Sequence, residues 1–103
     1  MPVGSLGRIT GNMGIVPPTA VLSGQVTLAA AAAPLVGVAT PCKSVTLENP
    51  NTNAVCYVGP AGVTALTGYR LQPGATVSLD IDDLNKVNVL GTVGNVISYV
   101  AVN

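Results

Sequence analysis

The side chains that most often carry out enzyme chemistry are scarce in this sequence. No histidine occurs among the 103 residues. Its absence removes the usual general base, the commonest metal ligand and the partner that activates serine or cysteine nucleophiles. The glycines follow neither the phosphate-loop nor the dinucleotide-binding spacing. We therefore expect the protein not to be an enzyme and to bind no cofactor.

Two cysteines, Cys42 and Cys56, are the only thiols. Thirteen residues separate them and no histidine accompanies them, so they cannot complete a zinc site. Alternation in Cys42–Glu48 and Val55–Val58 predicts a β-hairpin in which Cys56 faces Thr46. Cys42 then lies about 13 Å farther along the sheet, beyond the roughly 7 Å that a disulfide spans. We expect buried free thiols; the alternative is a bridge to a neighbouring chain or across a shifted register.

Asp80, Asp82 and Asp83 form the only acidic cluster. Clustered carboxylates are ligands that calcium prefers, but the D-x-D-x-D-G loop with its later glutamate is absent. Asp82 is also suited to cap a single helical turn over Asp83–Lys86, because its carboxylate accepts hydrogen bonds from free N–H groups of the turn. We favour capping and predict no metal site.

Four basic and four acidic residues leave the chain without net charge. Arg8, Lys43, Arg70 and Lys86 are scattered singly, so no basic patch is available to neutralise phosphates, and we predict no nucleic-acid partner. The longest apolar run, Val26–Ala39, is interrupted by proline and glycine and falls short of the ~20 residues that span a bilayer. No secretory signal pattern is visible either, and we expect no membrane anchor.

The apolar residues are numerous but small. They make up 49% of the chain, yet there is no Phe or Trp and only three Tyr, so Val, Leu, Ala and Ile must build the core. So little charge also protects a small domain poorly against association. We therefore predict an obligate oligomer or a part of a larger assembly. The alternative is a monomer whose apolar excess is exposed alanine.

Apolar and polar residues alternate in several short segments, which predicts an all-β fold: a small antiparallel β-sandwich of jelly-roll or Greek-key type. The expected strands are Val21–Leu28, Cys42–Glu48, Val55–Val58, Thr76–Ile81, Val87–Leu90 and Val96–Val102. Gln72–Ala75 has the signature of a type II turn between antiparallel neighbours, and Gly91–Asn95 is typical of a hairpin loop. The last strand is apolar on both faces, which indicates a central position or cover by another subunit. We assign an oligomer interface to Ile97, Tyr99, Val100 and Val102.

The first residues differ from the rest of the chain. Glycine recurs every three or four residues up to Pro17-Pro18, and this density disfavours both helix and strand. We predict an extended Gly/Pro-rich N-terminal arm over residues 1–20 and a β-sandwich domain over residues 21–103. The arm is apolar enough to order against a partner; the alternative is a disordered terminus. The predicted contact residues of the arm are Leu6, Arg8, Ile9, Met13, Ile15 and Val16.

Several segments between residues 22 and 103 carry a familiar pattern. They are Ser44–Asn49, Val55–Gly59, Val63-Thr64, Gly68-Tyr69, Leu71–Gly74, Asp83–Val87 and Val96–Tyr99. The pattern resembles small virion structural proteins of tailed bacteriophages, in which a β-sandwich module serves in capsid decoration (cement) proteins, head fibres and tail appendages. Cys56 departs from the more usual aliphatic residue, and residues 1–18 lie outside the resemblance.

The resemblance implies a capsid decoration protein: a homotrimer, made in the host cytoplasm, that binds the major capsid protein on the outside of the shell and stabilises it. The arm lies outside the resemblance, and its apolar composition leads us to expect that it lies across adjacent capsid subunits. A second hypothesis is a receptor- or glycan-binding module of a head fibre or tail appendage, with the loops Asn49–Asn53 and Pro60–Tyr69 as the binding surface. Against it, Tyr69 is the only loop aromatic suited to stacking on a sugar. A third hypothesis is a structural component of the tail or neck.

Overall fold

Strands form where apolar and polar side chains alternate. The computed structural model describes residues 20–103, which contain eight strands and one short 3₁₀ helix. The strands are β1 (Val21–Thr27), β2 (Ala33–Pro34), β3 (Ser44–Glu48), β4 (Cys56–Gly59), β5 (Tyr69–Leu71), β6 (Thr76–Leu79), β7 (Asn88–Leu90) and β8 (Val96–Val102), and the helix is η1 (Leu84–Lys86). Each of the six predicted segments contains a strand, whereas β2 and β5 were not predicted.

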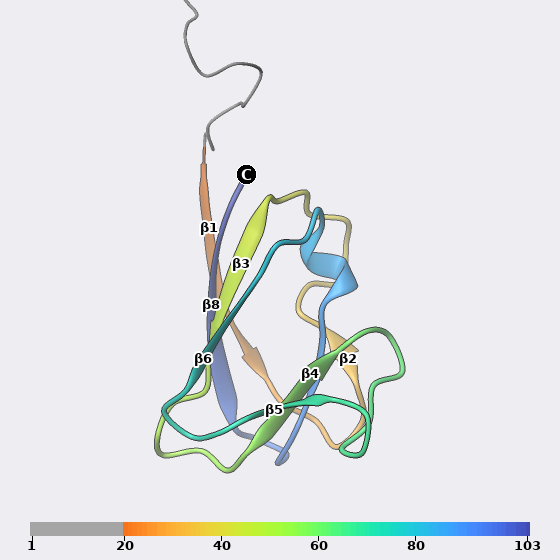
Figure 1. Ribbon diagram of the computed structural model, residues 1–103, viewed down its shortest axis with the longest axis vertical. Helices are drawn as coiled ribbons and strands as arrows, with labels where there is room; N and C mark the ends of the chain where they lie inside the picture. Colours follow the sequence, from red (N-terminus) through yellow and green to blue (C-terminus); the bar gives the residue numbers. More distant parts are fainter. Residues whose placement is uncertain (1–19) are drawn as a thin grey trace, which may run out of the picture.

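The strands form two four-stranded antiparallel sheets that pack face to face (Figure 1). Sheet A has the order β1-β8-β3-β6, and sheet B has the order β2-β7-β4-β5. Successive strands change sheet at every connection except that from β4 to β5. Eight strands in this order constitute a jelly roll. The predicted all-β sandwich is therefore confirmed, and it is of the jelly-roll type.

The core lies between the sheets and consists mainly of aliphatic side chains. Because alternate residues of a strand face opposite sides, burial alternates along β1, β3, β4 and β6. The buried side chains of sheet A are Val45, Leu47, Ile97 and Ala101, and those of sheet B include Cys56, Val58, Leu71 and Val89. Partly buried residues, Tyr99 among them, pack around this cluster.

Two predicted hairpins are wrong. β3 pairs with β6 and β8, whereas β4 pairs with β5 and β7, so the loop after Glu48 connects the two sheets. β7 and β8 also lie in different sheets, and Gly91–Asn95 crosses between them. The expected position of Cys56 opposite Thr46 is wrong for the same reason.

Connections that cross between the sheets are hydrogen-bonded to one another in pairs. The Leu28 N–H donates to the Asn95 carbonyl at 2.7 Å, which joins the β1–β2 and β7–β8 connections. The Asn49 N–H donates to the Ala75 carbonyl at 3.0 Å, which joins the β3–β4 and β5–β6 connections. The first two connections lead from the paired strands β1 and β8 of sheet A to the paired strands β2 and β7 of sheet B. The other two lead from β3 and β6 of sheet A to β4 and β5 of sheet B. Antiparallel pairing thus continues around the corner from one sheet into the other.

The type II turn predicted over Gln72–Ala75 is confirmed, but its neighbours are not those expected. Gly74 has a φ of +82°, and the Ala75 N–H donates to the Gln72 carbonyl at 3.0 Å. This combination defines a type II turn, which needs a residue with positive φ at its third position. Because β5 and β6 belong to different sheets, the prediction that the turn joins antiparallel neighbours is wrong.

Tyr99 covers a glycine in the edge strand β1. Gly24 is the register partner of Tyr99 in the β1–β8 pair. A Cβ atom at Gly24 would lie 2.7 Å from the Tyr99 hydroxyl and 2.9 Å from two ring carbons. The aromatic ring therefore packs on the backbone that glycine leaves bare, which is a known way of supporting glycine in an edge strand.

Gly24→Ala is expected to lower the free energy of unfolding by about 1–3 kcal/mol, because the added methyl group collides with the Tyr99 ring. Urea denaturation followed by circular dichroism measures this change. Gly37→Ala is the matched control: no atom lies within 4 Å of its added methyl group, so stability should stay the same or rise by up to about 1 kcal/mol. Equal losses in the two variants would contradict the packing of Tyr99 on Gly24.

Candidate functional site

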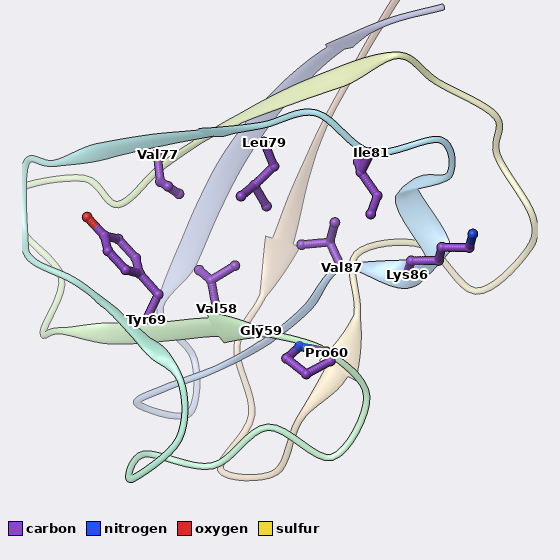
Figure 2. Close-up of a pocket in the computed structure, with 9 residues that line it drawn as sticks. All are labelled: Val58, Gly59, Pro60, Tyr69, Val77, Leu79, Ile81, Lys86 and Val87. Carbon is purple, nitrogen blue, oxygen red and sulfur yellow. The ribbon is translucent and has the colours of Figure 1, made fainter.

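The sandwich is open on one side, where two edge strands do not pair. Within the described residues, β6 is an edge of sheet A and β5 is an edge of sheet B. A cleft of about 490 Å³ enters the sandwich between them (Figure 2). It is lined by Val58, Gly59, Pro60, Tyr69, Val77, Leu79, Ile81, Lys86 and Val87. We refer to this feature as the edge cleft.

Alternation along β6 builds one wall of the edge cleft. Figure 2 shows Val77, Leu79 and Ile81 on one wall, facing Val58 and Val87 on the other. Val58 and Val87 are buried, whereas the residues of the β6 wall are partly exposed. All five side chains are aliphatic, so the cleft suits an apolar occupant that removes them from water.

Two polar side chains stand at the margin of the edge cleft. Tyr69 is 60% exposed. The Nζ of Lys86 lies 2.8 Å from Oδ1 of Asp82. The hydrogen bond between them, reinforced by their opposite charges, raises the pKa of Lys86 and lowers the pKa of Asp82. Lys86 therefore stays protonated at neutral pH and is unsuited to act as a base or nucleophile.

Asp83, not Asp82, caps η1, so the predicted cap was displaced by one residue. Oδ1 of Asp83 accepts hydrogen bonds from the Asn85 N–H at 2.9 Å and from the Thr40 N–H at 2.8 Å. Asp82 instead pairs with Lys86. Within residues 20–103, no three Asp, Glu or Cys side chains gather as ligands for a metal ion. The acidic cluster is thus divided between a cap and a surface ion pair.

Cys42 and Cys56 are buried free thiols, as predicted. Burial raises the pKa of Cys56. Burial, followed by the charges of Asp83 and Asp82, raises the pKa of Cys42, whose Sγ also donates to the Ile81 carbonyl at 3.2 Å. Both thiols stay protonated at neutral pH, and a protonated thiol is a poor nucleophile.

Ellman's reagent is expected to modify both thiols of the folded protein more than about tenfold more slowly than those of the urea-unfolded chain, because reaction needs local opening and a thiolate. The absorbance change at neutral pH, with and without urea, measures the two rates. A cysteine of the folded protein that reacts at the unfolded rate would contradict its burial.

The same pKa shifts predict a loss of stability at alkaline pH. The folded state holds both thiol protons more tightly than the unfolded chain does, so their contribution is complete below the ordinary thiol pKa of about 8.5. It is lost as the pH rises through the raised values. Urea midpoints across this range should decline for the natural protein and decline less for Cys56→Ala, whereas identical pH profiles would refute the assignment to Cys56.

The four residues predicted at an oligomer interface lie on two faces of β8. Ile97 is 0% exposed and packs in the core, and Tyr99 points to the same side. Val100 and Val102 face the opposite side, and Val100 is 46% exposed. The prediction is wrong for Ile97, because alternation turns its side chain into its own subunit. For Tyr99, which is partly buried, and for Val100 and Val102 it stays a prediction.

Val100 belongs to a broad surface, the outer face of sheet A, that carries little charge. Outward side chains on this face include Ser23, Gln25, Thr46, Ser78, Ser98 and Val100. Glu48 is the only charged residue in the four strands of the sheet. The Thr46 and Ser78 hydroxyls also hydrogen-bond to each other at 2.8 Å. Because charged residues are depleted at the centres of protein interfaces, this face suits contact with another protein.

The loop Asn49–Asn53, the first binding surface of the receptor- or glycan-binding hypothesis, is hydrogen-bonded to the rest of the fold through its asparagine side chains. Asn49 is 0% exposed, and its Nδ2 donates to the carbonyls of Ala54 at 2.9 Å and Leu71 at 3.0 Å. Nδ2 of Asn53 donates to Oδ1 of Asn49 at 3.0 Å and to the Val96 carbonyl at 2.7 Å. These amides therefore hold the fold together. Sequence reasoning missed this role because asparagines in a run of turn formers indicate an exposed loop.

The second loop, Pro60–Tyr69, is hydrogen-bonded within itself and exposes an apolar tip. The Thr64 N–H donates to Oγ1 of Thr67 at 3.0 Å, and the Gly68 N–H donates to the Thr64 carbonyl at 2.8 Å. Leu66 is 97% exposed. A fixed loop of this kind offers apolar contact more than polar recognition, and no sequence pattern singled out Leu66.

The arm residues predicted to contact a partner lie outside the described residues. They are Leu6, Arg8, Ile9, Met13, Ile15 and Val16. Their contacts, and the predicted division of the chain at residue 20, therefore stay predictions. No helix within residues 20–103 is long and apolar enough to cross a bilayer.

The edge cleft and the outer face of sheet A are the candidate functional sites of the described part of the chain. Each carries one charged residue, Lys86 at the margin of the cleft and Glu48 in the strands of sheet A, and the rest of each surface is uncharged. Both suit contact with an apolar ligand or with another protein. Comparison of the sequence with protein-family models and with curated proteins finds no match.

Proposed function

We propose that this protein is a virion structural protein of a tailed bacteriophage that decorates the outside of the capsid shell and stabilises it. The observation that carries the proposal is the outer face of sheet A, whose strands hold a single charged residue, Glu48. Burial of such a face against protein desolvates only one charged side chain. The sequence resemblance supplies the class of partner, the major capsid protein, and jelly rolls are common in viral capsid proteins.

Stabilisation would follow from mass action. A protein that binds the assembled shell but not its separated subunits makes the shell harder to open. A homotrimer would present three equivalent faces at once, and linked contacts bind more tightly than single ones. The N-terminal arm, with Leu6 and Ile9, would extend these contacts to adjacent capsid subunits.

Binding of the purified protein to undecorated heads tests the proposal. Val100→Glu places a charge in the middle of the outer face of sheet A, between Ser23 and Thr46, and should weaken binding at least about tenfold. Val93→Glu is the matched control, because Val93 is exposed in the β7–β8 connection. Equal binding by the two variants would refute the assigned face, and no binding by the natural protein would refute the function.

Deletion of Met1–Pro18 is expected to weaken binding to undecorated heads, because it removes the apolar arm that the proposal lays across capsid subunits. Cosedimentation with heads measures the change. Undiminished binding by the shortened protein would remove the arm from the shell contact.

A second candidate is a receptor- or glycan-binding module on a fibre or tail. The exposure of Leu66 in the β4–β5 loop and of Tyr69 at the start of β5 favours it. Copy number separates the two functions, since a decoration protein accompanies the major capsid protein in comparable amounts and a tail protein is present in few copies. Densitometry of virion proteins gives this ratio.

A further inference from the structure

The edge cleft has the properties of a site for an added β-strand. Within the described residues, β6 is paired only with β3, so its other backbone edge is unpaired. Its inward side chains Val77 and Leu79, with Ile81 beyond, leave an apolar cleft below that edge. Extended peptides bind such edges through backbone hydrogen bonds, and alternate side chains fill the pockets alongside.

One segment of this chain matches that site. Gly11–Val16 has the sequence Gly-Asn-Met-Gly-Ile-Val and contains no charge. In an extended strand, Met13 and Ile15 lie on one face because they are two residues apart. The opposite face of such a strand would carry Asn12, Gly14 and Val16. This pattern fits a strand that turns its two large apolar side chains, Met13 and Ile15, toward the cleft.

The length of chain before β1 is too short for this segment to reach the edge cleft of its own subunit, so we consider the cleft of a neighbouring copy. Ala20 directly precedes β1, and its carbonyl accepts a hydrogen bond from the Asn103 N–H at 3.1 Å. β1 is the far edge of sheet A, so a strand added beside β6 of the same chain would lie four strand spacings, about 19 Å, from β1. The four residue steps from Ala20 to Val16 span at most about 14 Å. A strand ending at Val16 therefore does not reach its own cleft.

We propose that Gly11–Val16 of one copy adds beside β6 of a second copy and places Met13 and Ile15 in its edge cleft. The contact joins two different surfaces, the arm of one subunit and the cleft of the next. Such contacts close into a ring when the rotation between subunits allows it, which agrees with the expected trimer. The proposal does not require the protein to bind a capsid, and it leaves Leu6 and Ile9 free for the shell.

A photo-crosslinking residue tests the contact in the full-length protein. p-Benzoylphenylalanine in place of Ile15 is irradiated in solution without heads, and the products are separated on a denaturing gel. The expected product has twice the mass of the chain, and its crosslink maps to residues 77–81. The same photo-crosslinker in place of Val3 is the control and should not give that crosslink. Products of single-chain mass only, or crosslinks from position 15 to another surface, would overturn the proposal.

Two charge substitutions test the same contact from both sides. Ile15→Asp and Leu79→Asp should each shift the sedimenting species from the oligomer to the single chain, whereas the controls Val3→Asp and Val93→Asp should not. Ile15 precedes the β-sandwich, so Ile15→Asp decides the matter even if Leu79→Asp does not fold. An unchanged oligomer in Ile15→Asp, or a lipid found by mass spectrometry in the cleft of the purified protein, would overturn it. Failure here, with binding to heads intact, would leave the proposed function standing.

Discussion

Ile97→Ala is expected to lower the free energy of unfolding by about 2–5 kcal/mol, the cost of removing a large buried aliphatic side chain. Ile97 is 0% exposed and belongs to the central core cluster. The substitution removes apolar contacts and leaves a cavity, because the packed neighbours close only part of the space. Urea denaturation of the natural and variant proteins, followed by circular dichroism, measures the difference.

Val100→Ala is the matched control on the same strand. Val100 is 46% exposed on the outer face of sheet A, so its truncation should change the stability of the fold by less than about 0.5 kcal/mol. The pair also separates a core role from an interface role. If Ile97→Ala dissociated an oligomer and left the fold as stable as before, the burial of Ile97 inside its own subunit would be refuted.

Asn49→Asp is expected to destabilise the fold by about 3–5 kcal/mol, the range found when a buried charge is left uncompensated. The Asn49 Nδ2 group donates to the Ala54 and Leu71 carbonyls. An aspartate of the same shape would turn a carboxylate oxygen toward these two carbonyl oxygens and would leave both without a donor. Urea denaturation at neutral pH measures the loss.

Asn51→Asp is the control for this substitution, since Asn51 is exposed in the same loop. The expected change is within about 0.5 kcal/mol. Lowering the pH should return part of the stability of Asn49→Asp, because the folded state of this variant favours the protonated, uncharged carboxyl group. Equal stability of the two variants at neutral pH would show that the buried amide network does not hold the loop.

The positions of most strands could be predicted because alternation is a local property. In Thr76–Ile81 the apolar residues Val77, Leu79 and Ile81 occupy every second position, and all three face inward. β2 and β5 escaped prediction because two or three residues are too few to show a period. The buried free thiols were also predicted, although the hairpin used to argue for them does not exist.

Strand pairing could not be predicted in the same way. The turn over Gln72–Ala75 has the residues and hydrogen bond of a type II turn, and such a turn can join a hairpin or a corner between sheets. Whether it joins a hairpin or a corner depends on which residues elsewhere in the chain contact the turn. Here it meets Asn49, whose N–H donates to the Ala75 carbonyl and whose carbonyl accepts from the Gly74 N–H at 2.6 Å. Asn49 lies more than twenty residues away in sequence, so no local pattern contains this information.

The candidate sites were likewise predictable only in the features that depend on local sequence patterns. Alternation in the chain marks Val77 and Leu79 as inward-facing and Val100 as outward-facing, and residue types alone show how little charge surrounds them. The jelly-roll order of the strands makes β5 and β6 edges within residues 20–103, with an apolar cleft between them. The same order encloses Ile97 in its own subunit. The reason is physical: periodicity and composition act between neighbours in the chain, whereas edges, clefts and burial arise from contacts between residues far apart in it.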